Sequence, residues 1–262
     1  MTLAPEIVQQ LAQHLENCEL DARDTTKITD EYPDMDWADA YAIQNEIRRR
    51  KLARGHKVVG LKAGLTSHAK MKQMGVDSPV FGFLADYFAV PDGGECKVGE
   101  LIHPKVEPEI AFVTHTALRG PGCHLGAVLA AIDLVLPGIE VIDSRYRDFK
   151  FDLKSVIADN TSASRFVLGG QARSAAGLDL RTLGVVLEKN GQPVALGAGA
   201  AVLGHPATAV AMLANHLGRY GEEIPAGTLI LSGGVTEAIP VAAGDHISLR
   251  VQHLGGTSIR FI

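Results

Sequence analysis

His103-Pro-Lys-Val-Glu-Pro-Glu-Ile-Ala-Phe-Val113 is the stretch on which both the fold and the candidate site depend. Its alternating apolar residues predict a β-strand over residues 106–114. Successive side chains of a strand point to opposite faces, so Glu107 and Glu109 share one face with Ala111 and Val113. The other face carries Val106, Pro108, Ile110 and Phe112. Both carboxylates therefore point into a layer that the sequence predicts to be buried.

The paired carboxylates need a physical explanation, because like charges about 4 Å apart repel by roughly 4 kcal/mol at an effective dielectric constant of about 20. One interpretation is an exposed edge strand with ordinary surface glutamates. The other is a bound divalent cation. Glu140 favours the cation, since it lies in an apolar run, although pairing with Arg145 or Arg147 would also account for it. Three oxygen donors without a nearby Cys or a paired His favour Mg²⁺, or Mn²⁺, over zinc.

Two further segments carry groups that can take part in chemistry. Lys62 ends an apolar run and is flanked by Gly60 and Gly64, which allow the backbone to approach its amine closely. Such a lysine can stabilise a developing enolate or transfer a proton, whereas a strand-end lysine that reaches solvent fits the same spacing. Residues 158–164 read Ala-Asp-Asn-Thr-Ser-Ala-Ser and offer hydroxyl and amide donors for a carboxylate. From the residues alone, an ordinary turn is favoured there.

The remaining pattern predicts an α+β protein. Helical spacing marks residues 5–22 and 36–54, joined by a turn-rich link. Strands are then predicted over residues 57–61, 80–90, 106–114, 139–142, 165–168, 185–188 and 228–231, with hairpin turns at Asn190-Gly191 and Gly255-Gly256. Two later helices are predicted over residues 125–136 and 205–218. We therefore expect a helical N-terminal segment, residues 1–56, and a β-rich core with a mixed, curved sheet, residues 57–262.

Composition limits the class of protein. The 262 residues are 46% hydrophobic and 21% charged, which is typical of a folded globular chain. The net charge of −5, with scattered Lys and Arg, argues against a nucleic-acid partner. The first residues lack a signal-peptide pattern, and the apolar stretch 125–142 contains Asp133, Pro137 and Glu140, so we expect no membrane insertion and a cytoplasmic location. Three widely spaced cysteines predict buried thiols.

The chain also resembles a known family, the hydratase and decarboxylase branch of the fumarylacetoacetate hydrolase superfamily. The motifs that carry the resemblance are Val59-Gly-Leu-Lys-Ala-Gly-Leu-Thr66, Met74-Gly-Val-Asp77, Glu107-Pro-Glu109, Gly138-Ile-Glu-Val-Ile-Asp-Ser-Arg145, Ala158-Asp-Asn160 and Leu203-Gly-His-Pro206. Three segments resemble the decarboxylases of the branch: Lys27-Ile-Thr-Asp-Glu-Tyr-Pro33, Gly82-Phe-Leu-Ala-Asp-Tyr-Phe88 and Ile142-Asp-Ser-Arg-Tyr-Arg-Asp-Phe-Lys-Phe151. The His-based dyad of the hydrolase branch has no match, which argues against hydrolysis of a carbon–carbon bond.

The resemblance implies a core of the fumarylacetoacetate hydrolase C-terminal type and a definite set of site residues. Metal ligands are expected at Glu107, Glu109 and Glu140, and a catalytic lysine at Lys62. A substrate pocket is expected to involve Asp77, Asn160 and Ser162.

The implied activity is Mg²⁺-dependent decarboxylation of a small 2-oxo dicarboxylic acid, 2-oxo-3-hexenedioate, in aromatic meta-cleavage catabolism. Its products are 2-hydroxypenta-2,4-dienoate and CO₂. One alternative is a hydratase acting on 2-oxopent-4-enoate (vinylpyruvate), which shares the metal and the electron sink. Another is a non-catalytic assembly partner of the pathway hydratase. The resemblance further implies a homo-oligomer and a complex with vinylpyruvate hydratase.

Overall fold

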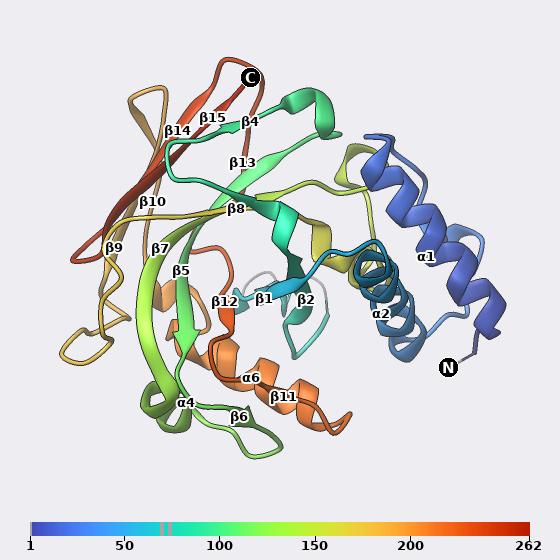
Figure 1. The fold of residues 1–262 in the computed structure, drawn as a ribbon, viewed down its shortest axis with the longest axis horizontal. Coiled ribbons are helices and arrows are strands. Elements are labelled where there is room, and N and C mark those ends of the chain that lie inside the picture. Colours follow the sequence, from blue (N-terminus) through green and yellow to red (C-terminus); the bar gives the residue numbers. More distant parts are fainter. Residues whose placement is uncertain (1, 69–70, 73–74) are drawn as a thin grey trace.

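A large mixed sheet forms the framework in this computed structural model, which describes residues 2–68, 71–72 and 75–262. The strand order is β2-β1-β12-β5-β7-β8-β3, and β13 also pairs with β5. The strands are β1 (Val58–Gly64), β2 (Val80–Ala85), β3 (Ala89–Val90), β5 (Lys105–Thr114), β7 (Ile132–Ile142), β8 (Ala163–Leu168), β12 (Leu229–Leu231) and β13 (Ile239–Pro240). Two pairs, β1 with β12 and β3 with β8, are parallel and the others antiparallel. Together with the bend of β5 and β7 in Figure 1, this confirms the predicted mixed, curved sheet.

A second sheet packs against the first and has the order β10-β9-β14-β15-β4. Its strands are β4 (Glu95–Cys96), β9 (Gly184–Lys189), β10 (Gln192–Ala198), β14 (His246–Val251) and β15 (Gly255–Phe261), and a small pair consists of β6 (Leu118–Arg119) and β11 (Glu223–Ile224). The Asn190-Gly191 hairpin is confirmed, with positive φ at both residues. The turn predicted at Gly255-Gly256 is wrong by a few residues. Val251 already pairs with Gly255, and His253, with φ of 64°, lies in the turn.

Five α-helices lie wholly within the described ranges: α1 (Pro5–Leu20), α2 (Trp37–Ala53), α4 (Leu125–Ala131), α5 (Leu153–Ala158) and α6 (Pro206–Gly218). A capping box in which Asp36 and Asp39 bond to each other's backbone N–H begins α2. The His205 ring accepts from Ala207 N and begins α6, which confirms the helix predicted over residues 205–218. The helix predicted over residues 125–136 is wrong beyond Ala131, because the following residues pair with β5 as β7.

Two apolar layers flank the large sheet. Between the sheets, β5 contributes Val106, Ile110 and Phe112 to a fully buried core, which confirms the predicted apolar face of that strand. On the other side, α1 and α2, at the right of Figure 1, pack with Phe83 and Tyr146 in a separate cluster. Because the helices share that cluster with core residues, the division between residues 56 and 57 stays a prediction.

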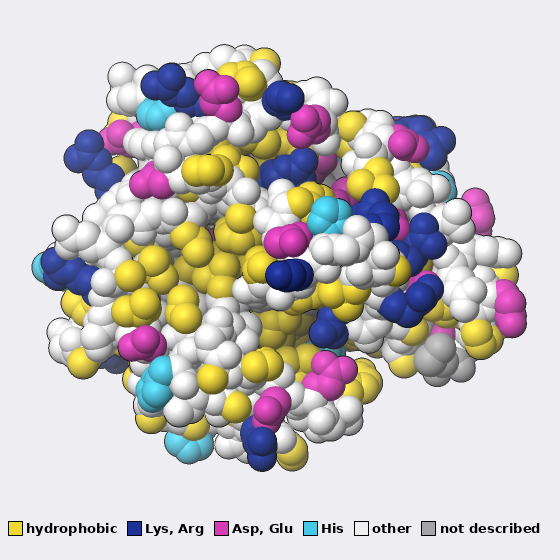
Figure 2. All heavy atoms as spheres, in the orientation of Figure 1, with side chains coloured by type: hydrophobic (Ala, Val, Ile, Leu, Met, Phe, Trp, Pro, Cys, Tyr) yellow, Lys and Arg dark blue, Asp and Glu magenta, His cyan; other side chains and the backbone are white. Residues whose placement is uncertain are grey.

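Figure 2 shows basic and acidic side chains interspersed on the face that it draws. Within the described ranges, none of the helices combines the length and apolar character needed to cross a bilayer.

Candidate active site

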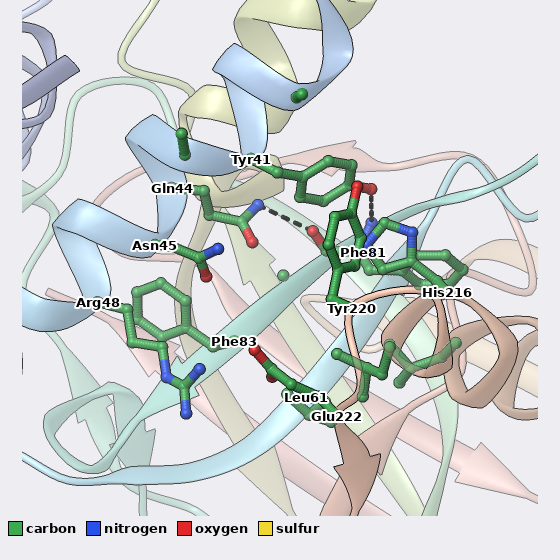
Figure 3. Close-up of a pocket in the computed structure, with 15 residues that line it drawn as sticks. Tyr41, Gln44, Asn45, Arg48, Leu61, Phe81, Phe83, His216, Tyr220 and Glu222 are labelled. Carbon is green, nitrogen blue, oxygen red and sulfur yellow. Dashed lines mark hydrogen bonds between the residues drawn. The ribbon is translucent and has the colours of Figure 1, made fainter. Parts of the chain in front are cut away.

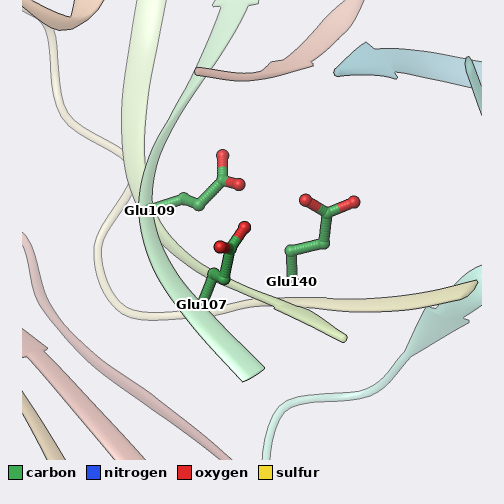
Figure 4. A group of neighbouring side chains, drawn as sticks. All are labelled: Glu107, Glu109 and Glu140. Carbon is green, nitrogen blue, oxygen red and sulfur yellow. The ribbon is translucent and has the colours of Figure 1, made fainter. Parts of the chain in front are cut away.

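Three glutamates meet on the concave side of β5 and β7 (Figure 4). Glu107 is the direct cross-strand partner of Glu140, and Glu109 is opposite Gly138, so the antiparallel register brings the three side chains together. One carboxylate oxygen from each lies within 4.8 Å of the others. Glu109 is 0% exposed and Glu140 is 1% exposed, in the interior of the sheet. The edge-strand interpretation of these glutamates is therefore wrong.

Burial makes this acidic triad electrostatically costly. Burial, and then the neighbouring charges of Glu140 and Glu107, raise the pKa of Glu109 well above its ordinary value. One stabilising contact comes from the backbone, because Gly233 N donates to Glu109 Oε2 at 2.7 Å. The remaining repulsion calls for positive charge at this point.

Lys62 supplies part of that charge from β1, which is separated from β5 by β12 in the sheet. Its ammonium lies 2.6 Å from Glu140 Oε1 and donates to Thr161 O at 3.0 Å, and the side chain is only 2% exposed. The alternative of a lysine that reaches solvent is therefore wrong. Arg145 and Arg147 pair instead with Asp159 and Asp24, so neither arginine accounts for Glu140.

The donor set fits a hard divalent cation. Glu109 Oε1 and both carboxylate oxygens of Glu140 are buried and accept no hydrogen bond from the part of the chain that the structure describes. The contact between Lys62 and Glu140 is thus an ion pair without hydrogen-bond geometry, and it leaves those lone pairs available. Clustered carboxylate oxygens without sulfur or imidazole donors suit Mg²⁺ or Mn²⁺.

The loop beneath Lys62 has an unusual backbone. Asn160, Thr161 and Ser162 all have positive φ, at 47°, 51° and 59°, a region that residues other than glycine seldom adopt. The Asn160 amide holds this loop to β2, since Oδ1 accepts from Phe83 N and Nδ2 donates to Phe83 O. A Cβ on Gly82 would lie 2.6 Å from Thr161 Oγ1, so only glycine permits this close approach.

Of the three predicted substrate-binding residues, two lie in the loop that contacts Lys62 and one lies outside it. Ser162 Oγ is buried without a hydrogen-bond partner among the described residues, in the loop that binds Lys62. Asn160 lies in the same loop, but its amide is engaged with the backbone of β2. Asp77 is exposed in the segment before β2, and no contact with the triad is described for it. The roles of all three residues in substrate binding stay predictions.

Sequence reasoning missed two supports of the site. Gly233 and Gly234 follow β12 and pass close to the triad, where a Cβ on Gly234 would lie 3.0 Å from Glu107 Cδ. The Arg145 guanidinium donates to Asp143 O, Ala163 O and Asp159, and so holds both ends of the Lys62 loop. A glycine pair after a predicted strand was the available signal for the first, whereas nothing in the sequence paired Arg145 with Asp159.

Taken together, the curled mixed sheet, the acidic triad with its two buried members and the adjoining lysine define a metal-dependent enzyme that acts on a small molecule. Residues 57–261 match the family model described as fumarylacetoacetate (FAA) hydrolase C-terminal. The chain belongs to the fumarylacetoacetate hydrolase family.

Individual relatives show which members of the family the chain is similar to. The chain is 64% identical to a 4-oxalocrotonate decarboxylase of Pseudomonas sp. (strain CF600), covering 100% of this chain and 99% of that one. It superposes with a TM-score of 0.98 on the 4-oxalocrotonate decarboxylase from Pseudomonas putida G7 complexed with magnesium and adipate, at 62% identity and with 100% and 99% of the two chains covered. A 2-hydroxyhexa-2,4-dienoate hydratase of Comamonas testosteroni is 40% identical, over 98% of each chain.

Proposed function

We propose that this chain catalyses the Mg²⁺-dependent decarboxylation of 2-oxo-3-hexenedioate (4-oxalocrotonate) to 2-hydroxypenta-2,4-dienoate and CO₂. The observation that carries the proposal is the acidic triad with Lys62, in a chain 64% identical over its full length to a decarboxylase of that name. The adipate bound to a relative supports the class of substrate, because adipate is also a six-carbon dicarboxylate.

Each residue of the site has a definite task in this reaction. Glu107, Glu109 and Glu140 would hold Mg²⁺, which would supply a Lewis acid for the 2-oxo carbonyl. Cleavage of the C5–C6 bond releases CO₂ and leaves an electron pair at C5, which delocalises through the C3–C4 double bond onto the C2 oxygen. The Lys62 ammonium, buried beside the triad, stabilises that negative charge where water does not screen it. Protonation of the C2 oxygen completes the dienol product.

The remaining predicted residues are proposed to bind the substrate. Ser162 Oγ, a buried hydroxyl without a partner in the described part of the chain, is suited to donate to a substrate carboxylate. Asn160 supports the same loop through its bonds to Phe83. Asp77, which is exposed in the segment before β2, is proposed to contact the substrate.

One assay separates this activity from its alternatives. Purified protein with Mg²⁺ and 2-oxo-3-hexenedioate should release one CO₂ for each dienol formed, and a chelator should stop the reaction. A hydratase would release no CO₂ and would hydrate added 2-hydroxypenta-2,4-dienoate. A non-catalytic assembly partner would do neither. The lower identity to the hydratase, at 40%, favours the decarboxylase.

The proposal also covers the oligomeric state of the protein and its location in the cell. We propose a homo-oligomer that also associates with vinylpyruvate hydratase in the cytoplasm. Light scattering of the purified chain tests the first point, and co-elution with the hydratase tests the second. A monomer that elutes separately from the hydratase would contradict both, and cell fractionation tests the location.

A further inference from the structure

A cavity lies between the helices α2 and α6 and the strands β1 and β2 (Figure 3). We call it the back pocket and define it by Tyr41, Arg48, Leu61, Phe83, His216 and Tyr220. Its volume is about 290 Å³, near the lower limit for small-molecule sites. On the face drawn in Figure 2, a hollow lined by hydrophobic side chains opens between the positions of α2 and α6.

Strand geometry separates the back pocket from the triad. Leu61 pairs with Phe83 across β1 and β2, and Lys62 pairs with Gly82. Neighbouring side chains of a strand point to opposite faces, so Leu61 and Phe83 form the floor of the back pocket while Lys62 points to the triad. A ligand in the back pocket therefore occupies a different site from the substrate.

The walls suit a flat, unsaturated ligand. The rings of Tyr41 and Phe81 lie 4.4 Å and 5.0 Å, centroid to centroid, from the ring of His216. Burial lowers the pKa of His216 to about 4, so this histidine is neutral near pH 7 and adds no positive charge. Aromatic faces and edges favour stacking against another planar ring.

Among the described residues that line the back pocket, Arg48 is the one permanent cation. Its Nε is buried and has no hydrogen-bond partner among the described residues, and no ion pair is described for its guanidinium. The next two residues of α2 differ, because Arg49 pairs with Glu46 and Arg50 with Glu16. A buried donor without an acceptor is unfavourable unless a ligand satisfies it. A carboxylate matches the planar guanidinium.

Of the described residues that line the same cavity, Glu222 is the one with an anionic side chain. It is exposed, so water and salt screen its charge, whereas Arg48 Nε is shielded from solvent. Arg48, rather than Glu222, therefore determines the charge of the ligand that the back pocket favours.

We propose that the back pocket binds a small planar aromatic carboxylate, with its carboxylate on Arg48 and its ring against Leu61 and Phe83. This site goes beyond the proposed decarboxylation and does not depend on it.

Isothermal titration of the full-length protein with Mg²⁺ tests the proposal, with benzoate as the probe. We expect benzoate to bind and saturating adipate to leave its affinity unchanged. Arg48→Gln should weaken binding roughly tenfold or more, as a lost charge-assisted contact does. Arg49→Gln is the matched control, since it removes the same charge from an exposed position on the same helix, and it should bind benzoate as the wild type does.

Two further comparisons sharpen the result. Ala42→Phe, which fills the back pocket from α2, should abolish benzoate binding, and Glu222→Gln should strengthen it. Benzyl alcohol and benzylamine should bind more weakly than benzoate. Competition by adipate, equal affinity in Arg48→Gln and the wild type, or tighter binding of benzylamine would each overturn the proposal. Circular dichroism verifies that each variant is folded.

Discussion

The candidate site depends on a balance of charge among a few residues. Three carboxylates face a single ammonium, and the pKa of Glu109 is raised because burial and two neighbouring anions all oppose its ionised form. A divalent cation would relieve both effects at once, since it attracts the carboxylates and replaces lost hydration. The individual side chains can therefore be tested by removing one charge at a time.

Glu109→Gln should abolish Mg²⁺ binding and activity while leaving the protein folded. A neutral amide is a weaker ligand for Mg²⁺, yet it removes repulsion from a fully buried position. Titration calorimetry with Mg²⁺ measures the first effect, and thermal unfolding without metal measures the second. Glu6→Gln, on the exposed side of α1, is the control. Unchanged activity of Glu109→Gln would reject the assigned ligand.

Lys62→Met should lower kcat roughly 100-fold or more without weakening Mg²⁺ binding, because the ammonium acts on charge that develops during the reaction. Removal of a cation beside the triad leaves the carboxylates free to bind the metal. Steady-state kinetics combined with metal titration separates the two quantities. If Lys62→Met lost metal affinity and turnover together, Lys62 would instead have a structural role.

At the scale of elements, the site depends on how a strained loop is held between strands. Asp159 and the left-handed residues 160–162 connect α5 to β8 and bring Thr161 O to Lys62. Their conformation is maintained by the Arg145 guanidinium, which donates to Asp143 O at 2.6 Å and Ala163 O at 3.1 Å and pairs with Asp159. A buried network of this kind fixes the loop relative to β7.

Arg145→Met should destabilise the fold by about 3–5 kcal/mol, because it leaves the buried Asp159 carboxylate without its partner. Denaturant unfolding measures the change in the free energy of unfolding. Arg147→Met is a matched control, since Arg147 pairs with Asp24 on the surface and its loss should have little effect. Similar unfolding midpoints for the two variants would show that the buried network is unimportant for stability.

At the scale of the whole molecule, α2 and α6 close over the back of the sheet that carries the triad. His216 on α6 contacts Tyr41 of α2 and Phe81 of β2, so one ring joins three elements. Its pKa is lowered to about 4, mainly by burial and secondly by Arg219. The folded protein thus favours the neutral imidazole.

Stability should therefore fall as the pH drops from about 6.5, the ordinary pKa of histidine, to about 4. In this interval the unfolded chain binds the proton more readily than the folded chain does, so acid favours unfolding. Thermal unfolding across the pH range should show a shallower decline for His216→Phe than for the wild type. His115→Phe, at an exposed position, should follow the wild type. Identical slopes for all three proteins would contradict the effect.

The sequence by itself determined the strand that carries Glu107 and Glu109, because period-two alternation assigns side chains to faces without any knowledge of the partner strand. It also indicated α1, α2 and α6, whose caps and apolar spacing are local features. The residue pattern also indicated the mixed, curved sheet, whereas the family resemblance assigned Glu140 and Lys62 to the site. The structure places both residues beside the pair.

Tertiary structure decided the rest. Residues 132–136 read as helix locally, but pairing with β5 makes them strand, since long-range hydrogen bonds outweigh a weak local preference. The choice of Lys62 rather than Arg145 as the partner of Glu140 depends on which segments meet in space. The left-handed backbone at residues 160–162 and the glycine contacts at the triad likewise arise from contacts between distant segments. Sequence spacing cannot encode such contacts, because they form only when the sheet curls.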